Sequence, residues 1–232
     1  MYKKIVGMLV LMLLMGSVIQ VVGTTIDKRN FHVEFDDNHN EANSDRIDQE
    51  QPIQTGNTFI IGEVSRAQSF IPTRETLTKV ELYIYKEGTM NADFKVSIRE
   101  NLIGSDLTSA SMQANQIPPN IQSQAWVEFN FADIEVNPGN VYYIVCTTQG
   151  GNLDNCYVLG CADNDPYPQG DAWEYGVFNN YIWQKMENLY GKPYDLCFRT
   201  YVEKSRFENS NLLLIKILEQ YINRFPMLNK IL

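Results

Sequence analysis

Aromatic residues crowd one segment of this sequence, and rings of this kind can bind a sugar. Flat sugar faces stack on exposed aromatic side chains, and neighbouring Asp, Asn and Gln side chains bond the hydroxyl groups. The residues that we predict to contact a ligand are Trp173, Tyr175, Trp183 and Tyr167. Large aromatic residues also fill the cores of β-sandwiches, so burial in the core is the competing interpretation.

The acidic segment CADNDPYPQGDAWE, which overlaps the aromatic one, could supply oxygen ligands to a metal ion. Calcium binds about six to eight oxygens from carboxylates, carbonyls and amides, and turn-rich loops supply them. The candidate ligands are Asp163, Asp165 and Asp171, with Glu174 close behind. The spacing does not match the EF-hand pattern, and clusters of Asn, Asp and Pro also occur because they form turns. Calcium binding and a metal-free turn therefore both stay open.

Four cysteines follow one another in the second half of the chain, at Cys146, Cys156, Cys161 and Cys197. In an exported domain such a set predicts two disulfides. Cys146 and Cys156 are symmetric about Gly151, and they would face each other across two strands if the turn around Gly151 closed a hairpin. Cys161 would then pair with Cys197 by elimination. The alternative is that all four are small buried apolar residues.

Residues able to catalyse a reaction are scarce. The two histidines, His32 and His39, lie before the folded domain, so a histidine base or an imidazole zinc site is not expected inside the fold. The sequence contains no Ser/His or Cys/His arrangement and no phosphate-binding glycine loop. A glycoside hydrolase would need two facing carboxylates, for which the candidates are Glu128, Asp133, Asp171 and Glu174. We expect a non-catalytic protein, with glycoside hydrolysis as the third hypothesis.

Short segments with a period of two must position these side chains. In FKVSIRE, Phe94, Val96 and Ile98 alternate with polar residues, and LTKVELYIYK and AWVEFNF alternate in the same way. This alternation is what a strand with one buried face requires. Gly, Pro and Asn cluster between the segments, as they do in turns. Many short strands without a helical stretch among them predict an all-β fold, an antiparallel β-sandwich over residues 53–202.

The N-terminal region has two parts that differ in composition. In residues 1–23, Lys3 and Lys4 precede the apolar run from Ile5 to Val22, which is typical of a secretory signal peptide. An uncleaved membrane anchor is the alternative, since the run nearly spans a bilayer core. Residues 24–52 are rich in Asp, Glu and Asn without apolar periodicity, which predicts a disordered linker. Either interpretation of the first segment places the domain outside the cytoplasm.

The C-terminal tail, residues 203–232, changes to a helical period. Leu214, Leu218, Tyr221 and Phe225 recur at spacings of four and three, which predicts a short amphipathic helix. Such a helix can pack against its own domain, form oligomers, dock a partner or associate with a membrane surface. These interpretations of the tail stay open.

The charge of the chain restricts its partners. Asp and Glu outnumber Lys and Arg by 28 to 19, which gives a net charge of −9. An acidic surface repels phosphate backbones, so we do not expect a nucleic-acid partner. The partner that we expect is a cell-surface glycan or protein.

The middle of the chain resembles a known module. The pieces that carry the resemblance are, in order, AQSFIPTRETLTKVELYIYKEG, FKVSIRENLIGSDLTSAS, AWVEFNFADIEVNPGNVYYIV, DPYPQGDAW and YDLCFRTY. Over residues 53–201 they resemble a jelly-roll-like β-sandwich module of archaeal and bacterial exported cell-surface proteins, often of unassigned function. The resemblance implies an extracellular, non-catalytic domain and supplies no catalytic residues. The four cysteines depart from the pattern of that module.

Together these observations predict an extracellular binding or adhesion module, with carbohydrate as the preferred ligand class. The loop patch from Asp163 to Trp183 would present the ligand contacts. The second hypothesis is a structural cell-surface component that acts through its C-terminal tail. Solvent-facing rings at Trp173, Tyr175 or Trp183 would favour binding, and buried rings would favour the structural role.

Overall fold

The computed structural model describes residues 45–203 of the chain. The predicted signal peptide or anchor (residues 1–23), most of the predicted linker and the predicted C-terminal helix lie outside the described residues. Within residues 45–203, no helix is both long enough and apolar enough to cross a membrane.

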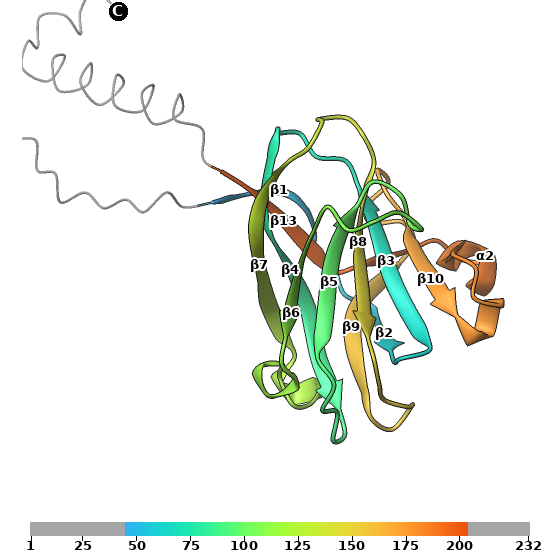
Figure 1. Cartoon of the computed structure of the whole chain (residues 1–232). Coiled ribbons are helices and arrows are strands. Elements are labelled where there is room, and N and C mark those ends of the chain that lie inside the picture. Colours follow the sequence, from blue (N-terminus) through green and yellow to red (C-terminus); the bar gives the residue numbers. More distant parts are fainter. Residues whose placement is uncertain (1–44, 204–232) are drawn as a thin grey trace, which may run out of the picture. The chain divides into compact units, whose positions relative to one another are not determined.

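Two antiparallel β-sheets face each other in the described part of the chain (Figure 1). The first sheet contains, in this order, β1 (Arg46–Gln51), β13 (Phe198–Val202), β4 (Thr76–Glu87), β9 (Cys156–Asp163) and β12 (Tyr194–Leu196), with β2 (Gly56–Ile60) paired to β9 and β7 (Ala125–Glu135) paired to β4. The second sheet has the order β11 (Gln184–Lys185), β10 (Ala172–Gly176), β3 (Val64–Phe70), β8 (Tyr142–Thr148), β5 (Phe94–Arg99) and β6 (Thr108–Met112). The predicted antiparallel β-sandwich is therefore confirmed.

The connections between strands cross repeatedly from one sheet to the other. β4 leads to β5 in the opposite sheet, and the chain changes sheets again from β6 to β7, from β7 to β8 and from β8 to β9. Short helical elements lie on the connections: η1 (Ala114–Gln116), η2 (Ile121–Ser123), η3 (Val177–Asn179) and α2 (Met186–Tyr190). Because so many connections join the two sheets, the sandwich is one packing unit.

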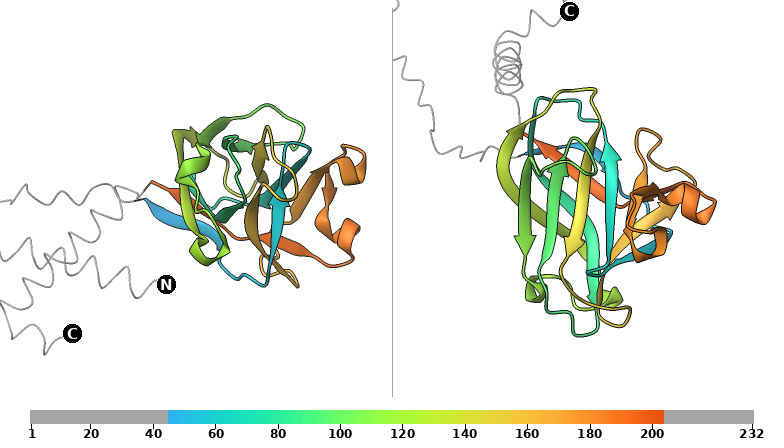
Figure 2. Two further views of the ribbon diagram at one scale, coloured as in Figure 1. Left: turned by 90° about the horizontal axis from the view of Figure 1, so that it is seen from below. Right: turned by 45° about the vertical axis from the view of Figure 1, so that its right-hand side comes forward.

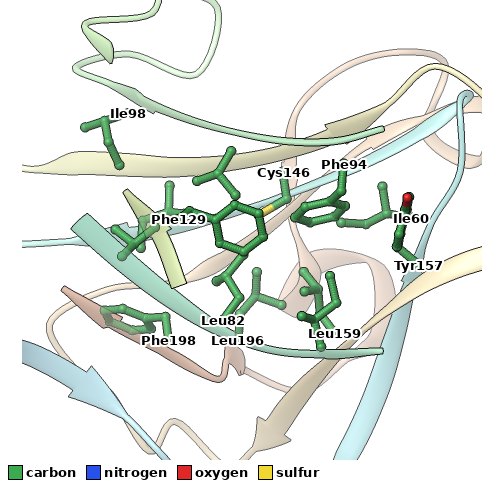
Figure 3. Packing of buried hydrophobic residues seen from close by; sticks show 14 of the residues in the cluster. Ile60, Leu82, Phe94, Ile98, Phe129, Cys146, Tyr157, Leu159, Leu196 and Phe198 are labelled. Atoms are coloured by element: carbon green, nitrogen blue, oxygen red, sulfur yellow. The ribbon is translucent and has the colours of Figure 1, made fainter. Parts of the chain in front are cut away.

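The core lies between the two sheets and consists of inward side chains from both. Phe94, Val96 and Ile98 of β5 are fully buried, as their alternation predicts. Figure 3 shows Phe94 of the second sheet beside Phe129 of the first, and the centroids of these two rings are 5.5 Å apart. Burying a side chain of this size stabilises the fold by about 1.5–3 kcal/mol.

Strand β1 begins inside the region predicted to be a linker. The composition predicts a linker up to residue 52, but the strand starts at Arg46, so the folded domain begins earlier than predicted. The inward side chains of β1 are amides: Gln51 Nε2 donates to the Leu196 carbonyl (3.3 Å), and Gln49 Oε1 accepts from the Tyr167 hydroxyl (2.9 Å). Because hydrogen bonds hold these side chains, hydrophobic periodicity does not detect the strand.

The predicted disulfides are absent, since all four cysteines are free and buried. The pairing of Cys146 with Cys156 needs a hairpin at Gly151. However, β8 belongs to the second sheet and β9 to the first, so the turn at Gly151 crosses between sheets instead of closing a ladder. The two cysteines therefore do not face each other across neighbouring strands, which is the arrangement that a cross-strand bond requires.

Cys161 and Cys197 lie close in the ladder but on opposite faces of the first sheet. Cys161 packs into the core. Cys197 Sγ instead lies 3.2 Å from the Ile53 carbonyl oxygen and 3.2 Å from where a Cβ on Gly160 would stand. Gly160 and Cys161 are consecutive in β9 and so point to opposite faces, which separates the two sulfur atoms. Burial raises the pKa of the Cys161 thiol to about 11 and that of Cys197 to about 12.

The described chain enters and leaves the sandwich at neighbouring points. β1 and β13 pair in antiparallel fashion, and Arg46 lies opposite Val202. Figures 1 and 2 show these two points on one side of the sandwich, and β10 and α2 on the other side. β10 and α2 are thus on the side of the sandwich away from both ends of the described chain.

Candidate functional site

A pocket of about 550 Å³ opens beside the start of strand β10. Its lining includes two aromatic and four charged side chains, Tyr143, Trp173, Asp165, Asp171, Lys185 and Glu187. Asp165, Asp171 and Trp173 belong to the loop patch that the sequence predicts. The pocket therefore brings together part of the predicted ligand surface with residues from β8, β11 and α2.

Strand β10 directs Trp173 into this pocket. Ala172, Glu174 and Gly176 are buried on its inward face, so Trp173 and Tyr175 point outward and are half-buried. The Trp173 ring stands at 76° to the ring of Tyr143, with centroids 6.2 Å apart. Lys185, which pairs with Trp173 across the β10–β11 ladder, holds its ammonium group 5.7 Å from the Trp173 ring centroid. The pocket thus has an aromatic wall with a cation beside it.

The charged groups in the pocket are mostly acidic. Lys185 Nζ forms an ion pair with Asp171 Oδ2 at 2.8 Å, and this hydrogen bond raises the pKa of the Lys185 ammonium. Asp165 and Glu187 add two further exposed carboxylates. Three carboxylates against one ammonium group give the lining a net negative charge, which favours neutral or cationic ligands over anionic ones.

The buried ion pair between Arg66 and Glu174 fixes β10 to its neighbour β3. Arg66 Nη2 lies 3.0 Å from Glu174 Oε2, and both side chains are almost wholly buried. Glu174 Oε2 also accepts a hydrogen bond from the Tyr190 hydroxyl (2.6 Å), and Arg66 Nε donates to Thr58 Oγ1 (2.8 Å). With Glu174 held inward in this way, its neighbours Trp173 and Tyr175 must present their rings outward.

A buried carboxylate supports the loop on the other wall of the pocket. Asp195 accepts hydrogen bonds from Gln68 Nε2 (2.9 Å) and from the backbone N–H of Tyr167 (3.1 Å). Gln68 Oε1 in turn accepts from the backbone N–H of Leu196 (2.7 Å). Burial raises the pKa of Asp195 to about 6. These bonds hold the loop that carries Asp165 against the sandwich.

Tyr167 is a core residue, contrary to the prediction that it contacts a ligand. It is buried, and its ring meets the ring of Phe198 edge to face at 5.1 Å. Its hydroxyl group donates to Gln49 on β1. Tyr175 and Trp183 do face outward, with ring centroids 5.4 Å apart, but they do not line the pocket.

The predicted calcium ligands do not come together. Asp163 accepts from Thr55 Oγ1 (3.0 Å) and pairs with Lys192 (3.4 Å), while Asp171 pairs with Lys185. Within residues 45–203, no group of three or more His, Cys, Asp or Glu side chains is placed to hold a metal ion. Asn164 and Asp165 have the left-handed φ angles of a tight turn, 69° and 55°. Asn164 and Asp165 thus form a turn, as clusters of Asn, Asp and Pro commonly do.

The carboxylates considered for glycoside hydrolysis lie in different places. Glu174 is buried with Arg66, Asp171 lines the pocket, and Glu128 forms an ion pair with Lys79 (2.8 Å) on the outer face of the first sheet. Asp133 is exposed on β7, in the first sheet. The structure thus does not gather these four groups around one cleft.

Six of the lining residues lie outside the loop patch that the sequence predicts, among them Tyr143, Lys185 and Glu187. Tyr143 follows the buried Tyr142 in β8 and points to the opposite face, but the run YYIVC is apolar throughout and does not mark which face is buried. Lys185 and Glu187 carry no signal in the sequence either, since their position in the pocket depends on the pairing of β11 with β10.

Comparison with family models finds no match, and comparison with curated proteins finds none either. Among solved structures, the chain is similar to the clostridial cysteine protease Cwp84 after propeptide cleavage (TM-score 0.49, 13% identity, 69% of this chain and 40% of that one). It is also similar to the cysteine protease and lectin-like domains of Cwp84, a surface layer associated protein of Clostridium difficile (TM-score 0.48, 14% identity, 69% of this chain and 36% of that one). The chain thus spans less than half the length of either structure, and similarity at this level assigns it no function.

Proposed function

We propose that this protein is a non-catalytic extracellular binding module that takes a saccharide in the pocket beside Trp173. The observation that carries the proposal is the pairing of a half-buried Trp173 ring with a surrounding set of carboxylate and ammonium groups. Pockets for small ligands combine an aromatic wall with a few fixed polar groups in this way. The outward position of Trp173, Tyr175 and Trp183 also favours binding over a purely structural role.

The proposed chemistry divides between the aromatic and polar sides of the pocket. A sugar ring stacks on Trp173, whose ring stands at 76° to that of Tyr143. Asp165, Asp171 and Glu187 accept hydrogen bonds from the hydroxyl groups of the sugar. The net negative lining favours neutral sugars or amino sugars and disfavours uronates and sialylated glycans. Because the Arg66–Glu174 pair and the Asp195 network fix both walls, little ordering entropy is lost on binding.

The cell-surface part of the proposal depends on the N-terminal segment and on the resemblance to exported modules. The charged and apolar pattern of residues 1–23 directs the chain out of the cytoplasm in this proposal. Strand β10 and helix α2, which carry Trp173 and Glu187, lie on the side of the sandwich away from the points where the described chain begins and ends (Figure 2). In this proposal a chain attached through an end presents that side outward.

Binding of the full chain to a glycan array tests this function. The array should include neutral, amino-sugar and uronate-containing glycans. We expect hits in the first two groups and a loss of about tenfold or more in affinity for Trp173→Ala, since a lost stacking contact weakens binding by roughly 1–3 kcal/mol. Failure of every glycan to bind, or binding unaffected by Trp173→Ala, would contradict the proposal.

Trp126→Ala is the matched control for this experiment. Trp126 is also a half-buried tryptophan, but it lies on β7 in the first sheet, with the guanidinium of Arg199 4.0 Å from its ring centroid. We expect this variant to bind like the unmodified chain. Thermal unfolding followed by circular dichroism should establish that both variants are folded.

A further inference from the structure

Three aromatic side chains outside the pocket form a second cluster on the β10–β11 hairpin. The Tyr175 ring centroid lies 5.4 Å from that of Trp183 and 5.9 Å from that of Tyr181. Trp183 and Tyr175 are half-buried, and Tyr181 is half exposed. We refer to Tyr175, Tyr181 and Trp183 as the aromatic strip.

The aromatic strip continues directly from the pocket. Trp173 and Tyr175 are two residues apart on β10, so they share a face and are separated by about 7 Å along the strand. Lys185 pairs with Trp173, which places Trp183, two residues earlier, beside Tyr175. A chain molecule with one end beside Trp173 would therefore meet Tyr175 and Trp183 next.

The loop that carries the strip is held rigidly by buried hydrogen bonds. Asn179 is buried, and its side chain accepts from the Gly176 N–H (2.8 Å) and donates to the Glu174 carbonyl (2.9 Å). The Tyr181 N–H donates to the Gly176 carbonyl (2.8 Å). These bonds keep Tyr181 at a φ of 56°, a left-handed conformation that is uncommon for a bulky residue.

Gly176 adds a close backbone contact to this arrangement. A Cβ at this position, where φ is 157°, would lie 2.3 Å from the Glu63 carbonyl oxygen. The loop backbone is thus pressed against the β2–β3 turn, where a side chain would not fit. A rigid loop that exposes aromatic rings loses little conformational entropy when a ligand binds, and strained backbone conformations of this kind cluster at functional sites.

The strip is uncharged. Residues 175–183, with the sequence YGVFNNYIW, contain no Asp, Glu, Lys or Arg. Its rings can stack on apolar sugar faces, and its two tyrosine hydroxyls and the nearby Gln184 can bond sugar hydroxyl groups. This chemistry matches an uncharged saccharide, which is the class that the acidic pocket also favours.

We propose that the aromatic strip binds the following units of an extended, uncharged oligosaccharide whose first unit occupies the pocket at Trp173. The inference rests on the proposed function and adds that the ligand is a chain of several sugar units. Affinity must then increase with chain length, and the increase must depend on the strip.

Calorimetric titration of the full chain with β-1,4-linked oligomers of glucose and of N-acetylglucosamine, from single units to hexamers, tests the inference. We expect the hexamer to bind about tenfold or more tightly than the single unit. Trp183→Ala should abolish this increase and leave the affinity for the single unit within about twofold, whereas Trp173→Ala should weaken both.

Phe178→Ala is the matched control, because Phe178 lies on the same loop but its ring packs against Phe59, with centroids 6.3 Å apart. It should keep the dependence on chain length. Equal affinity for the single unit and the hexamer would leave the pocket function intact and overturn the inference. Equal losses of hexamer affinity for Phe178→Ala and Trp183→Ala would overturn the inference as well. If no oligomer binds, the inference fails, and the glycan array decides separately whether the proposed function fails with it.

Discussion

Asp195 shows how a single buried residue couples the pocket loop to pH. An aspartate in an unfolded chain has a pKa of about 3.9, whereas burial raises that of Asp195 to about 6. Between about pH 4 and pH 6, Asp195 therefore holds a proton in the folded chain that it has released in the unfolded chain. This group therefore adds stability below about pH 4, and that contribution is lost as the pH rises through about 6.

We expect Asp195→Asn to remove this dependence. The free energy of unfolding at pH 4.5 and at pH 7, measured with urea, should differ less in the variant than in the unmodified chain, by about 2 kcal/mol. The variant should also be less stable at both pH values, because its amide NH₂ cannot accept from the Tyr167 N–H. An unchanged difference between the two pH values would contradict the raised pKa of Asp195.

At the scale of the element, β10 depends on the buried pair of Arg66 and Glu174. Replacing Arg66 with Met would leave the Glu174 carboxylate buried with the Tyr190 hydroxyl as its remaining side-chain partner. Breaking a buried pair in this way costs about 3–5 kcal/mol, which urea unfolding should reveal.

Arg199→Met provides the comparison for this variant. Arg199 also pairs with a glutamate, Glu81, at 3.2 Å, but its side chain is 25% exposed on the outer face of the first sheet. We expect a loss of about 1 kcal/mol or less there. Equal losses for the two arginine variants would show that the buried pair has no special role in holding β10.

The elements also show what the sequence can predict. Alternation in FKVSIRE correctly predicts the buried face of β5. In β10 hydrophobicity would mislead, because Trp173 and Tyr175 face outward while the charged Glu174 is buried with Arg66. Hydrophobic periodicity does not detect strand β1, because its buried side chains are amides whose hydrogen-bond partners lie 145 and 118 residues away in sequence. Lys185 and Tyr143 reach the pocket through strand pairing, which local patterns do not encode. The disulfide prediction fails for the same reason, since it assumes that β8 and β9 are neighbours.

At the scale of the whole molecule, the four thiols report on global folding. All of them are buried, and burial raises the pKa of the Cys146, Cys161 and Cys197 thiols, so the reactive thiolate is scarce. We expect a maleimide to label none of them rapidly in the native protein. In denaturant without reductant, mass spectrometry should find all four labelled. Fewer than four labels under that condition would show a disulfide.

The pairing of β1 with β13 has a mechanical consequence. Because Arg46 lies opposite Val202, a force that pulls the two ends of the domain apart acts first on the hydrogen bonds nearest those ends. The ladder then opens one bond at a time, in the manner of a zipper, and each step needs little force. A force that pulls both ends of the domain in the same direction does not separate β1 from β13, so it does not load the hydrogen bonds between them. The sandwich is therefore suited to attachment with both ends on one side, and it would be a weak link if it were inserted lengthwise between two load-bearing segments.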